Sequence, residues 1–151
     1  MRLLLSAFVM VLACRLSIAA EPTSAPPVNC SAWQVNGFFV GMLKTAPMPP
    51  AAKGEMWKGL SYNTAEGKLL GYSGHFEGVD PAVLRGELTA RLGKPETEDQ
   101  IVKDGRDPGR YTRWVSEACD TEISLGDLFA PSEHGKTSVV LLSIEKLPVK
   151  R

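Results

Sequence analysis

A single helix, marked at both ends by residues that stop it, most constrains how this chain can fold. Asp80 is an N-cap residue whose carboxylate can accept a hydrogen bond from a free amide of the first turn, and Pro81 fits the first helical position. Gly93 can end the helix in a left-handed conformation, and Pro95 prevents it from resuming. The sequence therefore predicts a helix over residues 81–92.

One side of this helix is apolar. Leu84, Leu88 and Leu92 recur every four residues, which is typical of a helix that packs on a sheet. The residues expected beside this stripe are Val83 and Ala90, and those expected on the other side are Arg85, Glu87, Thr89 and Arg91. Gly86 costs about 1 kcal/mol relative to alanine, and a close approach of the helix to the sheet would explain its presence.

The remaining segments predict strands. Met56–Tyr62 and Lys68–Phe76 flank five turn residues that end in Gly67, which indicates a hairpin. Further strands are expected at Trp33–Met42, Tyr111–Ser116, Thr121–Leu125 and Val139–Ile144. The last of these is continuously apolar, which is typical of a central strand covered on both faces. The expected fold is α+β, an antiparallel sheet of four to six strands with one main helix packed on one face.

Two polar segments interrupt the strands. Glu96–Arg110 contains Asp104-Gly105 and Asp107-Pro108-Gly109, and is expected to be an exposed loop or the tip of a long hairpin. Leu128–Lys136 is expected to be a second turn-rich loop.

The N-terminus has the pattern of a secretory signal peptide. Arg2 precedes the apolar stretch Leu3–Ala13, which is too short to span a bilayer, and cleavage sites follow at Ala19 or Ala20. We therefore expect a periplasmic or secreted protein. The alternative is a lipoprotein, because Val11-Leu12-Ala13-Cys14 resembles the box in which Cys14 is acylated; only then would the chain bind a membrane. The expected division is a signal peptide at 1–20, a flexible Pro-rich lead at 21–29, a single domain at 30–147 and a basic tail at 148–151.

Cys30 and Cys119 remain in the mature chain under either alternative. An exported compartment is oxidising, and two cysteines there usually pair. A Cys30–Cys119 disulfide is predicted, and the chain-entropy model gives it about 4–5 kcal/mol.

Charge and motifs argue against several function classes. Residues 1–20 hold two of the 17 basic residues and none of the 17 acidic ones, so the mature chain has a formal net charge of −2. This balance gives no electrostatic basis for binding nucleic acid. His75 and His134 lack a second ligand at metal-binding spacing, and no nucleophile elbow, phosphate loop or dinucleotide motif occurs. The sequence predicts no catalytic residue, no metal site and no cofactor, and His75 is expected to face solvent.

The three tryptophans, Trp33, Trp57 and Trp114, are many for a domain of this size. Most are expected in the core, and one or two are candidates for an exposed binding anchor, because aromatic residues dominate interface hot spots.

The segment Met56–Leu147 resembles small exported Gram-negative α+β proteins of mostly unknown function. The shared layout is a hairpin, a helix that ends in Leu-Gly-x-Pro, a strand with Trp114, and two more strands. More loosely, it is similar to the helix-plus-sheet modules of the outer-membrane assembly lipoprotein BamE and the β-lactamase inhibitor protein. This resemblance implies a non-enzymatic binding scaffold and assigns no functional residue.

We therefore expect an exported, non-catalytic binding protein with a protein partner, most concretely an inhibitor or immunity protein acting on a cell-envelope hydrolase or a toxin. One alternative is a structural accessory protein of the envelope. The other is a small hydrolase that uses the acidic clusters Glu96, Glu98, Asp99 and Glu117, Asp120, Glu122. The two polar loops are the expected contact surface, because loops on a rigid sheet carry binding. The candidate partner-binding residues are Glu96, Glu98, Asp99, Asp104, Arg106, Arg110, Glu133 and His134.

Overall fold

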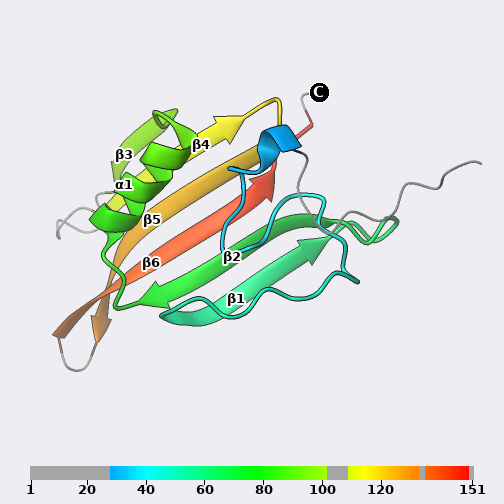
Figure 1. The fold of residues 1–151 in the computed structure, drawn as a ribbon. Coiled ribbons are helices and arrows are strands. Elements are labelled where there is room, and N and C mark those ends of the chain that lie inside the picture. Colours follow the sequence, from blue (N-terminus) through cyan, green and yellow to red (C-terminus); the bar gives the residue numbers. More distant parts are fainter. Residues whose placement is uncertain (1–27, 102–108, 133–134, 150–151) are drawn as a thin grey trace, which may run out of the picture.

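The computed structural model describes residues 28–101, 109–132 and 135–149, which form a six-stranded antiparallel sheet with one α-helix (Figure 1). In chain order the elements are η1 (Val28–Cys30), β1 (Glu55–Tyr62), β2 (Leu69–Glu77), α1 (Pro81–Leu92), β3 (Thr97–Ile101), β4 (Gly109–Ser116), β5 (Thr121–Ser132) and β6 (Gly135–Lys146). The expected α+β class is confirmed. Within the described part of the chain, no helix reaches the length and apolar character that a membrane span requires.

The strand order is β1-β2-β6-β5-β4-β3, and each neighbouring pair is antiparallel. The last strand in sequence, β6, therefore lies inside the sheet between β2 and β5. The helix α1 carries the chain from β2 to the opposite edge, where β3 begins (Figure 1). The β1–β2 hairpin is thus joined to the antiparallel meander β3–β4–β5–β6 by the pairing of β2 with β6.

The predicted β1–β2 hairpin is confirmed, and Asn63 organises its loop. The Asn63 side-chain oxygen accepts a hydrogen bond from the Ala65 amide at 2.8 Å, and Gly67 takes a positive φ of 63°. The register shifts between Ser61 and Tyr62, so that Leu69 rather than Leu70 is the buried leucine at this end of β2.

The predicted helix is confirmed at both ends. The Asp80 carboxylate accepts hydrogen bonds from the amides of Ala82 at 2.8 Å and Val83 at 3.4 Å. Gly93 ends the helix with φ 87° and ψ −167°. Its φ is positive as expected, but its ψ lies outside the left-handed helical region.

The apolar stripe of the helix is narrower than expected. Leu88 is buried and Leu84 and Leu92 pack partly buried against the core, but Val83 is 57% exposed. Ala90, expected beside the stripe, is also exposed. Gly86 does not mark a close approach, because a Cβ added there would meet nothing within 4 Å. Both expectations were wrong because α1 touches the sheet along one narrow line of leucines.

The predicted strand at Trp33–Met42 is wrong. Val35 and Phe38 exchange backbone hydrogen bonds of 2.9 and 2.8 Å around Asn36 and Gly37, whose φ values are 50° and 81°. Two consecutive positive φ values at an Asn-Gly pair define a tight two-residue turn. The apolar residues are nevertheless buried, because this segment folds as turns against one face of the sheet.

Strands extend into both of the predicted loops. Thr97–Ile101 pairs with β4, which confirms the hairpin-tip alternative for the first polar segment. In the second, β5 continues to Ser132 and β6 begins at Gly135, so Leu128–Lys136 is the end of a long hairpin and not a loop. Pro131 lies beyond Asp127, the last β5 residue that pairs with β4, so β4 makes no demand on the missing amide there. At this position β5 pairs with β6.

The core lies between the sheet and the turns of the N-terminal segment. The rings of Phe38 and Tyr72 stack with centroids 4.4 Å apart. The Tyr72 hydroxyl donates a hydrogen bond to Glu55 at 3.0 Å and accepts one from the Asn36 side chain at 3.1 Å. Burial raises the pKa of Tyr72 to about 12. This network connects the Asn36-Gly37 turn to the β1–β2 hairpin.

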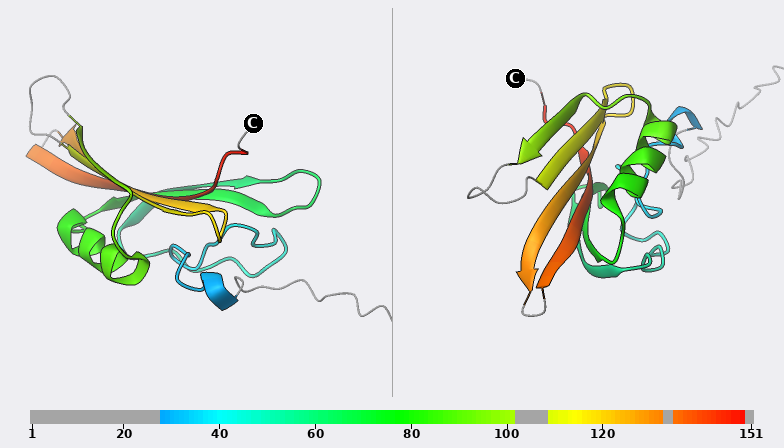
Figure 2. Two further views of the ribbon diagram at one scale, coloured as in Figure 1. Left: turned by 90° about the horizontal axis from the view of Figure 1, so that it is seen from above. Right: turned by 90° about the vertical axis from the view of Figure 1, so that its left-hand side faces the viewer.

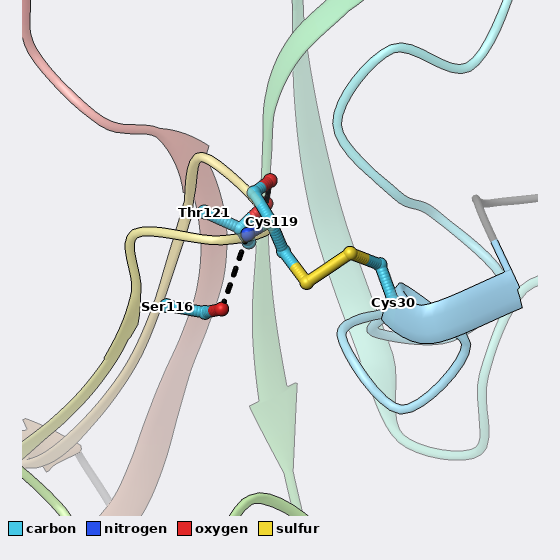
Figure 3. Close-up of a disulfide and its surroundings, with 4 residues drawn as sticks. All are labelled: Cys30, Ser116, Cys119 and Thr121. Carbon is cyan, nitrogen blue, oxygen red and sulfur yellow. Dashed lines mark hydrogen bonds between the residues drawn. A yellow bond between two sulfur atoms is a disulfide. The ribbon is translucent and has the colours of Figure 1, made fainter.

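The predicted Cys30–Cys119 disulfide is confirmed, with Cα atoms 5.7 Å apart (Figure 3). The turn that carries Cys119 is held by the Ser116 hydroxyl, which accepts a hydrogen bond from the Cys119 amide at 3.2 Å. The Thr121 hydroxyl donates to the Cys119 carbonyl at 2.7 Å. The disulfide therefore anchors the N-terminal segment to the β4–β5 turn.

Candidate functional site

One face of the sheet is left uncovered by the described elements. Figure 2 shows α1 and the N-terminal segment on the same side of the sheet. In β6, Val140, Leu142 and Ile144 are 0–3% exposed on that side, whereas the alternating Val139 and Leu141 are only partly buried. The expectation that β6 is covered on both faces is therefore wrong. We call the uncovered side the open face.

A row of small residues crosses the open face from β1 to β5. Each member is the register partner of the next: Gly59, Ser73, Ser143 and Ser124. This small-residue row spans three strand spacings, about 14 Å. The hydroxyls of Ser124 and Ser143 are 2.7 Å apart, and both residues are only 8% exposed. The row therefore places small residues next to one another on four neighbouring strands.

Trp57 stands at one end of the open face and is 54% exposed. Its indole lies over Gly59, because a Cβ added to Gly59 would come within 2.7 Å of the Trp57 ring. The imidazole of His75 packs beside the indole, with ring centroids 5.0 Å apart and planes tilted by 59°. His75 is exposed, as expected. Trp57 is thus an exposed aromatic side chain that its neighbours hold in place.

A groove of about 690 Å³ lies on the open face beside this tryptophan. Its floor is formed by Ser61, Gly71 and Ser73, and its other side by the residues from Glu145 to Val149. In Figure 2, the chain after β6 rises on the side opposite α1, which forms this second wall. The groove therefore offers hydroxyl groups, backbone and an apolar wall within reach of Trp57.

Arg113 on β4 is the register partner of Ser124, and it forms ion pairs at this end of the small-residue row. Its Nε lies 2.9 Å from a Glu122 carboxylate oxygen, an ion pair and not a well-aligned hydrogen bond. Its Nη1 lies 3.6 Å from a Glu96 carboxylate oxygen. The two acidic clusters thus converge on one guanidinium.

The structure separates the residues expected to bind a partner. Glu98 and Asp99 lie on β3, which is an edge strand and not a loop, and Glu96 lies just before it. Glu96 and Glu98 are exposed. By register Asp99 lies on the open face, whereas Glu98 and Arg110 belong to the other face. Asp104, Arg106, Glu133 and His134 lie outside the described residues.

The acidic clusters are arranged as surface ion pairs. Glu96 and Glu122 flank Arg113, and Asp120 lies 3.4 Å from the Lys146 ammonium. In the described residues, no group of three His, Cys, Asp or Glu side chains is placed to hold a metal ion. Among the described residues, Glu96, Glu122 and Asp120 are therefore engaged in ion pairs with Arg113 and Lys146.

Sequence reasoning missed Gly59, Ser61 and Ser73 as surface residues. A signal was present, because Gly59/Ser61 and Gly71/Ser73 each repeat at the strand period of two residues. Of the three tryptophans, Trp114 is 1% exposed and donates its indole N–H to the Gly93 carbonyl, and Trp33 is half-buried. Only Trp57 is therefore free to act as the expected aromatic anchor.

Comparison of the chain with protein-family models, with curated proteins and with solved structures gave no match.

Proposed function

We propose that this protein is an exported, non-catalytic binding protein that uses the open face of its sheet to contact a protein partner. In its most concrete form it is an inhibitor or immunity protein that acts on a cell-envelope hydrolase or a toxin. The signal-peptide pattern and the disulfide support export, because disulfides persist in oxidising compartments.

The observation that carries this proposal is the exposed Trp57 beside the groove. A tryptophan side chain brings a large contact area at low cost in conformational entropy, and tryptophan is enriched among interface hot spots. The indole already packs over Gly59 and beside His75, so part of its conformational freedom is lost before binding.

The test is affinity capture from periplasmic and envelope extract with the mature protein, compared with two arginine variants. Ser61→Arg fills the groove, and the matched control Ala90→Arg adds the same charge at an exposed position of α1. We expect one stoichiometric partner to be retained by the unmodified protein and by Ala90→Arg, and to be lost with Ser61→Arg. Capture that is equal for all three proteins would contradict the proposal, as would no capture.

The sequence box at Val11–Cys14 favours the accessory-protein alternative. Mass spectrometry of the mature N-terminus distinguishes the two. A diacylglyceryl group on Cys14 would indicate a membrane anchor, whereas cleavage after Ala19 or Ala20 would indicate a freely diffusing protein.

A further inference from the structure

The open face has an acidic surplus that the balanced composition of the chain conceals. The full sequence has 17 basic and 17 acidic residues. By register and burial, the acidic and basic residues that the strands place exposed or partly exposed on the open face are Glu77, Asp99, Glu122, Glu145, Arg113 and His75. Four are carboxylates and one is a guanidinium, and a histidine is mostly neutral at pH 7. Lys146 occupies a register position of the other face but also lines the groove.

A second observation indicates where a cation is needed. Glu122 and Glu145 are direct register partners on β5 and β6. Like charges directly opposite each other destabilise a sheet. Arg113 pairs with Glu122, but among the described residues no ion pair is formed by Glu145. Lys146, the nearest cation in sequence, pairs with Asp120. Two carboxylates thus occupy directly opposite positions on β5 and β6, and an external cation at Glu145 would reduce the repulsion between them.

We infer that the partner docks a basic surface on the open face, with a lysine or arginine at Glu145 and an apolar side chain against Trp57. This inference rests on the proposed function and specifies the chemistry of its partner. Glu145 also lines the groove, so a basic side chain that enters the groove reaches it directly. A second copy of this chain is a poor occupant, because two open faces brought together would juxtapose their carboxylates. Nucleic acid is disfavoured for the same reason.

The first test uses a defined cation and does not depend on finding the partner. Pentalysine is titrated into the ¹⁵N-labelled mature protein at low salt, with pentaglutamate as the control peptide. We expect pentalysine to shift the amide resonances of Ser143, Glu145 and Glu122 more than those of α1, and pentaglutamate to shift none of them. Shifts spread evenly over the protein, or concentrated on α1, would overturn the inference.

The second test measures association with the captured partner as a function of salt. Glu145→Gln is expected to slow association about three- to five-fold at low salt and to flatten the salt dependence, because charges at an interface act mainly on the on-rate. The matched control Glu87→Gln removes a carboxylate from an exposed position of α1. It is expected to change neither the association rate nor its salt dependence.

The two experiments separate the inference from the proposed function. A partner that is captured but is insensitive to Glu145→Gln would overturn the basic-surface inference and leave the binding function standing. Pentalysine shifts on the open face without capture of any partner would support the acidic site and contradict the binding function.

Discussion

At the scale of single residues, Tyr72 shows what the core requires of a buried polar group. The side chain is 1% exposed, and its hydroxyl bonds to both Asn36 and Glu55. A buried hydroxyl must keep its partners, since a buried polar group left unpaired costs about 1–3 kcal/mol.

Tyr72→Phe is expected to lower the free energy of unfolding by about 1–2 kcal/mol at neutral pH, because the Glu55 and Asn36 side chains lose a partner. Urea denaturation measures this loss. Tyr111→Phe, at a partly exposed tyrosine, is the control and is expected to cost less.

The same residue should also make the stability of the protein depend on pH in the alkaline range. The pKa of Tyr72 is raised to about 12 in the folded state, from an ordinary value of 10. The folded state thus holds this proton more tightly than the unfolded chain, and the associated stability is complete below pH 10 and is lost as the pH rises to about 12. We expect unfolding free energy to fall between pH 10 and 12, and to fall less steeply in Tyr72→Phe. Parallel slopes for the two proteins would contradict the assignment.

At the scale of elements, sequence signals succeeded where the cause was local. The Asp80 cap, Pro81 and Gly93 act within a few residues of the chain, so the ends of α1 could be predicted from them. The strand predicted at Trp33–Met42 was wrong because apolar residues indicate burial but not conformation. The Asn36-Gly37 turn decides the conformation of this segment.

Gly86→Ala is expected to stabilise the protein by about 0.5–1 kcal/mol. The position is helical and open, so the added methyl group removes the conformational cost of glycine without a clash. Gly93→Ala is the opposite case, because φ is 87° there, and it is expected to destabilise. Thermal unfolding of the two variants measures both changes in stability, an increase for Gly86→Ala and a decrease for Gly93→Ala. Destabilisation by Gly86→Ala would mean that α1 approaches a neighbour more closely than described.

At the scale of the whole molecule, the disulfide links two segments 89 residues apart in sequence. The segment with Cys30 is held to the sheet otherwise by buried side chains such as Phe38 and Phe39 and by a few backbone bonds. Which face of the sheet this segment covers could not be predicted, because strand periodicity gives two faces and does not say what packs on each. The open face, and with it Trp57, was therefore beyond the reach of sequence patterns alone.

The double variant Cys30→Ala/Cys119→Ala is expected to lose about 2–5 kcal/mol of unfolding free energy. Hydrogen exchange should show the greatest loss of protection in residues 31–46, with smaller changes in β5 and β6. An equal loss of protection throughout the sheet would show that the segment and the sheet unfold as one unit. Reduction of the unmodified protein with dithiothreitol is the control and should reproduce the effect.

The position of β6 also bears on how the chain reaches its native state. β6 is the strand to which both β2 and β5 pair. Until it is present, the β1–β2 hairpin and the β3–β5 strands share no sheet, and the most separated pairings must wait longest to form. The complete sheet can therefore form only after β6 has been synthesised, and a chain that ended before Gly135 would hold two unconnected fragments of sheet.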